Sequence, residues 1–411
     1  MHAIHHEISK PEAPHRVMAY CHDSVGIGHL RRTLTICERV GREHAGASFL
    51  LATGTPFVQL LRPDSPIDFI KLPALKKSIN GVYESKYLAV TPEQILGCRM
   101  SLLLETVRSY EPDLLLVDKA PLGVCRELVP TLRWIKANRP DIRIIFGMRD
   151  IEDEAEATIA QWSRDGVQEV IEECYDAVWV YGMRSIFDVV EQYQLSDRIA
   201  AKLRYMGYIV RPACHHGPRA DARKTVLVTV GGGTDGARVL NTYLEGAAQR
   251  VSALGARSII IGGPDLPAAV QEQVRSATAR VAGAEYLDFE PCMSCQIRQA
   301  DAIVCMGGYN TMCEVATQRK LALVIPRTQP RLEQKIRAER WQNLGVVRML
   351  TDPEFSAAAL ADCTIDLLTQ PRPASIPLAL DGLQRVASEF RTFWTDDTLL
   401  EPRDANLVPL Q

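Results

Sequence analysis

Three glycine-rich stretches in this 411-residue chain each follow an apolar segment and precede a helical one. They read SVGIGH from Ser24, GGGTDG from Gly231 and GGYNT from Gly307. Glycine lets the backbone approach a ligand closely, and a helix that starts there offers free N–H groups and the positive end of its dipole. This layout suits phosphate, although a single loop of this kind is more often only a tight turn. Two of them in one half of the chain favour a nucleotide.

Two familiar nucleotide-binding patterns are absent from the sequence. In the first loop, Arg31 stands where a dinucleotide-binding fingerprint has its third glycine, and the next predicted strand ends without an acid for the ribose. The P-loop pattern, which places a lysine after spaced glycines, does not occur. We therefore expect neither a dinucleotide cofactor nor ATP hydrolysis of the P-loop type.

Strand-like apolar segments alternate with helical ones, which predicts parallel sheets covered by helices on both faces. The segment from Arg211 to Lys224 interrupts this rhythm with proline, charged and small residues, as a domain linker does. We therefore divide the chain into a loose tail (1–14), an N-terminal domain (15–212), a linker (213–223), a second domain (224–375), and a C-terminal helix and tail (376–411) that could pack back on the first domain.

The composition excludes several classes of protein. Hydrophobic residues make up 46% of the chain and charged residues 24%, as in a globular protein, and the net charge of -3 lacks the basic balance of a nucleic-acid binder. No apolar run is long enough to span a bilayer, and the N-terminus lacks the apolar core of a secretory signal. Eleven cysteines, an odd number, fit a reducing compartment. We expect a cytoplasmic protein without a nucleic-acid partner.

The second half of the chain resembles the inverting glycosyltransferases of family 28 and their relatives with the GT-B fold. The stretch GGTDGAR from Gly232 is similar to the loop with which that family faces the donor diphosphate. The stretch FEPCM from Phe289 falls where the family meets the nucleotide base. The family's donor signature of glycine, serine or threonine, glutamate, proline and a pair ending in glutamine is matched by Gly308, Thr311, Glu314, Pro326 and Glu333–Gln334.

The resemblance implies an α/β fold of the GT-B type, with two doubly wound Rossmann-like domains facing each other across a cleft. It also implies a set of residues that bind the donor, which are Gly233, Thr234, Gly236, Phe289, Met293, Gly307, Gly308, Asn310, Thr311, Glu314, Glu333 and Gln334. The stretch GIGHLRR, which contains Gly26, Gly28 and His29, resembles the family's N-terminal glycine loop.

Each donor residue has a plainer alternative role. Glu314, one turn into its helix, could accept hydrogen bonds from both ribose hydroxyls, or it could serve only to favour the helix dipole. Asn310 or Thr311 would cap the helix and could reach phosphate. Glu333 and Gln334 would reach the sugar hydroxyls, or they could simply begin an exposed helix.

The chain also departs from the family pattern. Arg319 and Leu321 stand where the wider family often has glycine and proline, and Glu333 replaces the first glutamine of a pair. These differences leave the identity of the donor sugar open.

The reaction implied is displacement at an anomeric carbon, which requires a base for the acceptor hydroxyl and a partner for the charge of the leaving diphosphate. The sequence has no Asp-x-Asp metal signature, so we expect backbone amides and a helix dipole to take that charge. We predict that His29 is the base and that Asp118, at the end of a predicted strand, orients it. Asp23 is a rival for either role, and His29 could instead be a helix-start residue bonded to backbone.

Another pair of charged residues ends a different predicted strand on the cleft side. These residues, Arg149 and Asp150, could bind the acceptor or stabilise their own loop.

The sequence thus predicts a metal-independent, inverting glycosyltransferase without a cofactor, which uses a nucleotide-sugar, with a UDP-sugar favoured, and a glycan or lipid-linked acceptor. One alternative is a sugar-nucleotide hydrolase or 2-epimerase, which would use the same loops without an acceptor. Another is a non-catalytic subunit that binds nucleotide-sugar, in which we would expect the His29 loop to be eroded. We expect a cytoplasmic location, with peripheral contact at the inner face of the membrane if the acceptor is lipid-linked.

Overall fold

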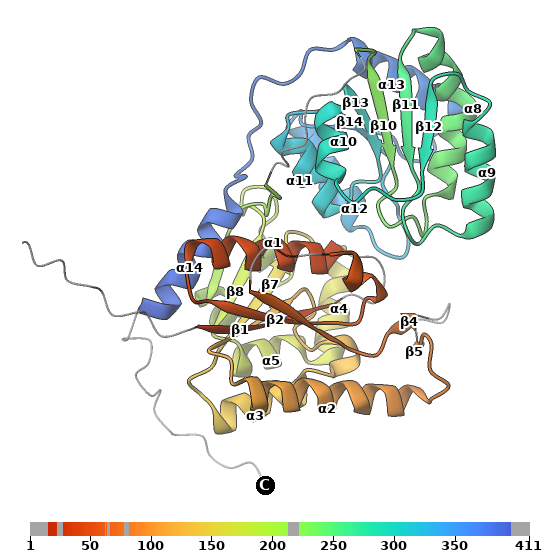
Figure 1. Cartoon of the computed structure of the whole chain (residues 1–411). Coiled ribbons are helices and arrows are strands. Elements are labelled where there is room, and N and C mark those ends of the chain that lie inside the picture. Colours follow the sequence, from red (N-terminus) through yellow and green to blue (C-terminus); the bar gives the residue numbers. More distant parts are fainter. Residues whose placement is uncertain are drawn as a thin grey trace, which may run out of the picture.

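The computed structural model describes residues 15–22, 28–61, 63, 66–77, 82–212 and 222–395. These residues form two α/β domains, and a C-terminal helix returns from the second domain to the first (Figure 1). Several predictions fall outside the described residues, namely those for the tail at 1–14, the linker residues 213–221, Asp23, Gly26 and the last residues from 396 onward.

The N-terminal domain is built on a seven-stranded sheet with the order β3-β2-β1-β6-β7-β8-β9. Every neighbouring pair of strands is parallel. Parallel strands need crossover connections, and helices on both faces of the sheet supply them. The strands are β1 (Arg16–Cys21), β2 (Ser48–Thr53), β3 (Ile67–Lys71), β6 (Leu114–Asp118), β7 (Arg143–Arg149), β8 (Ala177–Tyr181) and β9 (Leu203–Tyr205).

Helices and one small hairpin complete this domain. The helices are α1 (Gly28–Glu43), α2 (Pro92–Tyr110), α3 (Val129–Asn138), α4 (Ala155–Asp165), α5 (Val167–Cys174), α6 (Val189–Gln192) and α7 (Asp197–Ala201), with 3-10 turns η1 (Pro56–Leu60) and η2 (Val124–Arg126). The hairpin pairs β4 (Leu75–Lys77) with β5 (Tyr83–Ser85) in antiparallel fashion. Helix α2 begins at Pro92 because Thr91 and Gln94 form a reciprocal capping box there.

The second domain repeats this architecture with a six-stranded parallel sheet in the order β12-β11-β10-β13-β14-β15. Its strands are β10 (Thr225–Thr229), β11 (Arg257–Ile261), β12 (Ala284–Leu287), β13 (Ala302–Cys305), β14 (Leu321–Val324) and β15 (Arg348–Met349). Its helices are α8 (Ala237–Ala253), α9 (Ala268–Thr278), α10 (Met293–Gln299), α11 (Tyr309–Thr317), α12 (Glu333–Asn343) and α13 (Ala357–Thr369). The predicted pair of doubly wound domains is confirmed.

The strand order of each sheet reverses direction at one point. In the first sheet this point lies between β1 and β6, and in the second it lies between β10 and β13. The connections that leave these strands turn to opposite faces, which opens a crevice at the carboxyl ends of the strands. The predicted glycine loops after β10 and β13 lie at the crevice of the second sheet, and the described end of the first loop, Gly28 and His29, lies at the crevice of the first.

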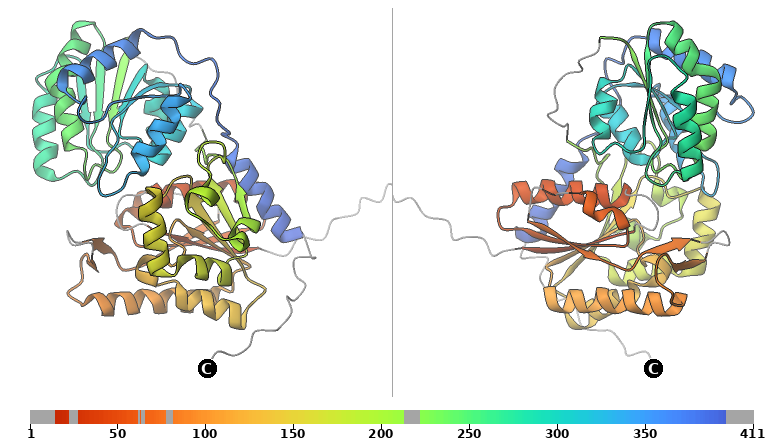
Figure 2. Two further views of the ribbon diagram at one scale, coloured as in Figure 1. Left: turned by 180° about the vertical axis from the view of Figure 1, so that it is seen from behind. Right: turned by 45° about the vertical axis from the view of Figure 1, so that its right-hand side comes forward.

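The last helix, α14 (Gly382–Thr395), lies beside α1 on the first domain (Figures 1 and 2). Its Leu383 and Phe390 are buried in one hydrophobic cluster with residues of α1, and the Phe390 ring centroid is 5.4 Å from that of Trp179. Trp394 stacks on His15 with 4.3 Å between ring centroids. The chain therefore returns to its first domain after completing the second.

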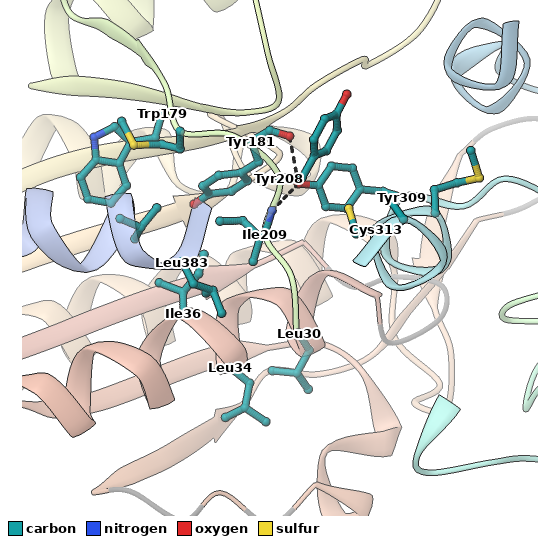
Figure 3. Close-up of a cluster of buried hydrophobic side chains, with 14 of the residues drawn as sticks. Leu30, Leu34, Ile36, Trp179, Tyr181, Tyr208, Ile209, Tyr309, Cys313 and Leu383 are labelled. Carbon is teal, nitrogen blue, oxygen red and sulfur yellow. Dashed lines mark hydrogen bonds between the residues drawn. The ribbon is translucent and has the colours of Figure 1, made fainter. Parts of the chain in front are cut away.

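The start of α11 joins the two domains. The hydroxyl of Tyr309 donates to the carbonyl of Tyr181 at 2.9 Å and accepts from the amide of Ile209 at 3.0 Å (Figure 3). Next to it, the Asn310 side-chain amide donates to the carbonyl of Gly28 at 2.9 Å. The helix that carries the predicted donor residues is thereby fixed to the first domain.

A buried ion pair crosses the same interface. Two nitrogens of Arg337 on α12 contact the two carboxylate oxygens of Asp150, which follows β7, at 2.6 and 2.8 Å. Both side chains are almost fully buried. A bidentate pair of this kind fixes orientation, and it becomes costly if either partner is removed. Asp150 therefore joins the domains, which favours the structural role over the acceptor role considered for it.

Candidate functional site

A cavity of about 540 Å³ lies between the two domains, within the usual size range of ligand sites. The first domain contributes residues of α1 together with Ile209 and Arg211, and the second contributes the segments that follow β10, β11, β12, β13 and β14. Nine of the predicted donor residues line it, which are Gly233, Thr234, Phe289, Met293, Gly308, Asn310, Thr311, Glu314 and Gln334.

The loop after β10 packs tightly against the loop that follows β11. Gly233 has φ of +98°, and a Cβ there would lie 2.4 Å from the carbonyl oxygen of Gly262, so only glycine fits. This turn brings Thr234 to the cavity. Gly236 does not line the cavity. It begins α8, where a Cβ would lie 2.4 Å from Val230, so close packing accounts for it.

The two glycines of the loop after β13 have different roles, one in the turn and one on the cavity wall. Gly307 has φ of +78°, and a Cβ there would lie 2.8 Å from Val324, so this residue makes the turn without lining the cavity. Gly308 caps α11, and a Cβ there would meet nothing within 4 Å. The open space over Gly308 leaves the first amides of α11 accessible to an anion.

Glu314 lies on the cavity wall with an exposed fraction of only 6%. Within the described part of the chain, the structure shows no hydrogen bond or ion pair to its carboxylate. Burial raises the pKa of Glu314 to about 7, and the nearby charges of Arg211 and Arg31 only partly oppose this. A buried carboxylate in this state gains free energy from any ligand that donates hydrogen bonds to it.

Phe289 and Met293, which the resemblance places near the nucleotide base, form an apolar part of the wall. Opposite them, the Arg31 guanidinium of the first domain lies 5.6 Å from the centroid of the Phe289 ring. Burial, together with the nearby charge of Arg211, lowers the pKa of Arg31 to about 10. Sequence reasoning noticed Arg31 only as a missing glycine, because its position in the cavity depends on how the domains face each other.

The two residues predicted to hold the donor sugar differ in position. Gln334 lines the cavity, and its side-chain oxygen accepts from the amide of Arg327 at 3.2 Å. Glu333 is buried away from the cavity and contacts Nη2 of Arg327 at 2.5 Å. Burial alone would raise the pKa of Glu333, but Arg149 and Arg327 hold it below its usual range. Arg327, which itself lines the cavity, therefore stands between Glu333 and any ligand.

His29 and Asp118 meet at the switch point of the first sheet. His29 Nδ1 lies 2.8 Å from one Asp118 oxygen, although the residues are 89 positions apart, because β1 and β6 are adjacent parallel strands. Arg32 contacts the other Asp118 oxygen through Nε at 3.0 Å and Nη2 at 2.7 Å. Its guanidinium also lies 5.4 and 5.2 Å from the ring centroids of Tyr181 and Tyr309. Sequence reasoning did not single out Arg32.

These contacts determine which nitrogen of His29 can accept a proton. His29 Nδ1 lies 2.8 Å from Asp118 Oδ2, which only accepts hydrogen bonds, and 3.0 Å from Arg32 Nη2, which only donates them. Nδ1 can therefore bond only one of the two, and we assign the ring proton to Nδ1 on the shorter contact with the carboxylate, which leaves the lone pair on Nε2. Burial lowers the pKa of His29 to about 4, so the ring is neutral near pH 7. Burial alone would raise the pKa of Asp118, but the charge of Arg32 and the hydrogen bond with His29 hold it below its usual range. His29 thus lines the cavity as a neutral imidazole whose orientation Asp118 fixes, an arrangement that a general base requires.

Comparison with known proteins is consistent with this geometry. Residues 225–377 match the model of the glycosyltransferase family 28 C-terminal domain. Over 171 residues the chain is 31% identical to the UDP-N-acetylglucosamine--N-acetylmuramyl-(pentapeptide) pyrophosphoryl-undecaprenol N-acetylglucosamine transferase of Salmonella arizonae, a match that covers 40% of this chain and 47% of that protein. The matched region thus spans about half the length of the curated relatives.

Solved structures of other proteins are similar in fold to this chain over most of its length. MurG of Acinetobacter baumannii has a TM-score of 0.54 and 16% identity, with coverage of 92% of this chain and 100% of that one. A UDP-N-acetylglucosamine 2-epimerase has a TM-score of 0.61 and 9% identity, with coverage of 97% and 100%. At these identities the likeness shows the fold alone. The chain therefore has the GT-B fold, and it resembles the family 28 glycosyltransferases through residues 225–377, which match the model of that family's C-terminal domain.

Proposed function

We propose that this protein is a metal-independent, inverting glycosyltransferase that moves a sugar from a UDP-sugar to a hydroxyl of a glycan or lipid-linked acceptor. One observation carries the proposal. His29 from the first domain, oriented by Asp118, lines the same cavity as Glu314 and the glycine loops of the second domain. A transferase requires a nucleotide site and a base for a second substrate, and this cavity would supply one from each domain.

The donor would lie along the second domain. Amides of the loops at Thr234 and Gly308 would bind the diphosphate, and Glu314 would accept hydrogen bonds from the ribose hydroxyls. Phe289 and Arg31 would flank the base. The Salmonella arizonae relative is named for UDP-N-acetylglucosamine, which supports uridine as the nucleoside.

In the proposed step, Nε2 of His29 takes the proton of the acceptor hydroxyl while its oxygen attacks the anomeric carbon from the face opposite the diphosphate. The bond between this carbon and the diphosphate oxygen breaks, and the nucleotide leaves with the electron pair. Asp118 stabilises the imidazolium that forms. The dipole and first amides of α11 stabilise the departing charge without a cofactor or metal ion.

Calorimetric titration with UDP, dTDP, GDP and ADP, in buffer containing EDTA, tests the nucleotide site. We expect one of these to bind to the wild type, with UDP favoured, and its affinity to fall sharply in Glu314→Ala. Activity that requires an added divalent ion would contradict the metal-independent mechanism. If none of the four binds, the proposal fails and the glycine loops are turns only.

A 2-epimerase or sugar-nucleotide hydrolase remains the second candidate, because the chain shares its fold with a UDP-N-acetylglucosamine 2-epimerase. Incubation of the protein with UDP-N-acetylglucosamine alone separates the two readings. Rapid formation of an epimer or of free sugar without an acceptor would favour the second candidate. A non-catalytic subunit is less well supported, because the contact between His29 and Asp118 is intact.

We also propose a cytoplasmic location with peripheral contact at the inner face of a membrane. None of the described helices combines the length and apolar character needed to cross a bilayer. Large apolar side chains are nevertheless exposed from β5 to the middle of α2, and they are Val82, Tyr87, Leu88, Val90 and Leu102. The relative's printed name includes a pyrophosphoryl-undecaprenol acceptor, which supports a lipid-linked acceptor and a membrane-facing surface.

A further inference from the structure

A second group of ionisable side chains lies near His29, at the carboxyl ends of β6 and β7. Three cations share one buried carboxylate oxygen of Glu152, with Lys119 Nζ at 3.3 Å, Arg149 Nη2 at 3.7 Å and Arg331 Nη1 at 3.9 Å. Arg331 comes from the second domain, so the group spans the domain interface. These four residues, which we call the basic cluster, are separate from the described lining of the donor cavity.

The charges of the basic cluster do not balance. Asp150 is paired with Arg337 at 2.6 Å. Glu333 is paired with Arg327 at 2.5 Å, and although the charge of Arg149 also acts on it, Glu333 lies outside ion-pair distance of Arg149. Among the described residues, Glu152 is the only carboxylate within ion-pair distance of the three cations. The cluster therefore carries a net charge of about +2 in a partly buried place, where water screens charge poorly.

Polar atoms of the cluster remain without partners. Arg149 Nε and Glu152 Oε1 are buried, and neither has a hydrogen bond in the described structure. The same holds for Nδ1 of His22, whose ring centroid is 6.1 Å from that of His29. Burial, together with the charge of Lys119, holds the pKa of His22 well below its usual range, so this ring adds no charge. Of these atoms Arg149 Nε is a donor, so an unsatisfied guanidinium donor and surplus positive charge lie next to the proposed base.

We propose that Lys119, Arg149 and Arg331 bind a phosphate-class dianion of the acceptor and so place an acceptor hydroxyl beside His29. This inference rests on the proposed function and adds to it the chemical class of the acceptor. Guanidinium forks and an ammonium group match the oxygens of phosphate. The net charge also suits a dianion better than the single charge of a sugar carboxylate.

The test uses the full chain saturated with UDP, so that the donor loops are occupied. Inorganic pyrophosphate and glucuronate are titrated separately by calorimetry. We expect one pyrophosphate per chain, an affinity about tenfold weaker in Arg149→Gln and in Lys119→Met, and much weaker binding of glucuronate. Lys136→Met is the matched control, because Lys136 pairs with Asp176 elsewhere in the domain. Its pyrophosphate affinity should equal that of the wild type.

Glu152→Gln separates anion binding from a purely structural ion network. Removing the internal counter-charge should tighten pyrophosphate binding severalfold, whereas a structural network predicts only a lower melting temperature. The inference is overturned if pyrophosphate does not bind the UDP-saturated protein or if its affinity is unchanged in Arg149→Gln. Equal affinity for glucuronate would overturn the phosphate class.

The UDP titration is carried out first, so a failure of the proposed function is distinguished from a failure of the basic-cluster proposal. If UDP does not bind, pyrophosphate is titrated into Arg149→Gln and into Arg211→Gln, which alters the donor cavity instead. Loss of affinity in Arg149→Gln alone would support the basic cluster, and loss in Arg211→Gln alone would overturn it.

Discussion

The first and second domains contribute different chemical groups to the walls of the cavity. On the second domain the wall includes the glycine loops after β10 and β13, which offer backbone amides, together with side chains such as Phe289 and Glu314, the one unpaired buried acid of this wall among the described residues. On the first domain it is ionisable side chains, with His29, Arg31 and Arg32 on one helix. Backbone amides recognise phosphate with little reorganisation, while side chains can move protons and tune charge. The contrast suggests that binding and proton transfer can be disrupted separately.

The largest expected effect comes from His29→Gln. Loss of a general base should lower kcat by about 10²–10⁴-fold, while UDP affinity stays close to that of the wild type. Steady-state kinetics and calorimetry on the same preparation measure both quantities. A parallel loss of UDP affinity would show that the first domain also binds the nucleotide. Nucleotide binding and proton transfer would then not depend on separate domains.

The buried ion pair between Arg337 and Asp150, which joins the two domains, can be broken by substituting Arg337. Arg337→Met leaves Asp150 buried without its cation, which should lower the free energy of unfolding by about 3–5 kcal/mol. The double variant Arg337→Met with Asp150→Leu should recover most of this loss, because no lone buried charge remains. Denaturant unfolding measures both. If the single variant costs less than about 1 kcal/mol, the pair does not stabilise the closed arrangement.

The comparison also explains what the sequence could predict. Gly308, Thr311 and Glu314 belong to one short stretch that resembles the donor signature of family 28, so their shared place in the cavity could be predicted from the sequence. The contact between His29 and Asp118 was foreseeable because adjacent parallel strands end at the same edge. Arg31 could not be assigned, because its surroundings depend on how two domains face each other. Glu333 was expected on the sugar but pairs with Arg327, a choice that no local pattern encodes.

A smaller effect concerns the pH dependence of UDP binding. The pKa of Glu314 is raised to about 7 by burial, and hydrogen bonds from ribose hydroxyls would favour its ionised form. UDP binding should therefore release a proton below pH 7, and affinity should rise about tenfold between pH 6 and pH 8. Calorimetry in buffers of different ionisation enthalpy detects the released proton.

Glu314→Gln is the control for this titration, since it cannot ionise. Its UDP affinity should be weaker and should lose the part of the pH dependence that belongs to the carboxylate. The change of ionisation of the UDP phosphate itself remains in both proteins and cancels in the comparison. Identical pH profiles for wild type and Glu314→Gln would remove the carboxylate from the nucleotide site.

The smallest effect lies outside the cavity, on the apolar side chains around β5. Leu88 is 56% exposed, and Leu254 on the second domain is 59% exposed, so each offers a similar apolar surface. If the first domain faces the membrane, Leu88→Asp should weaken binding to anionic lipid vesicles about fivefold, in line with the loss of one partly buried leucine. Leu254→Asp should leave it unchanged. Vesicle sedimentation measures both, and equal losses would assign no membrane face to either domain.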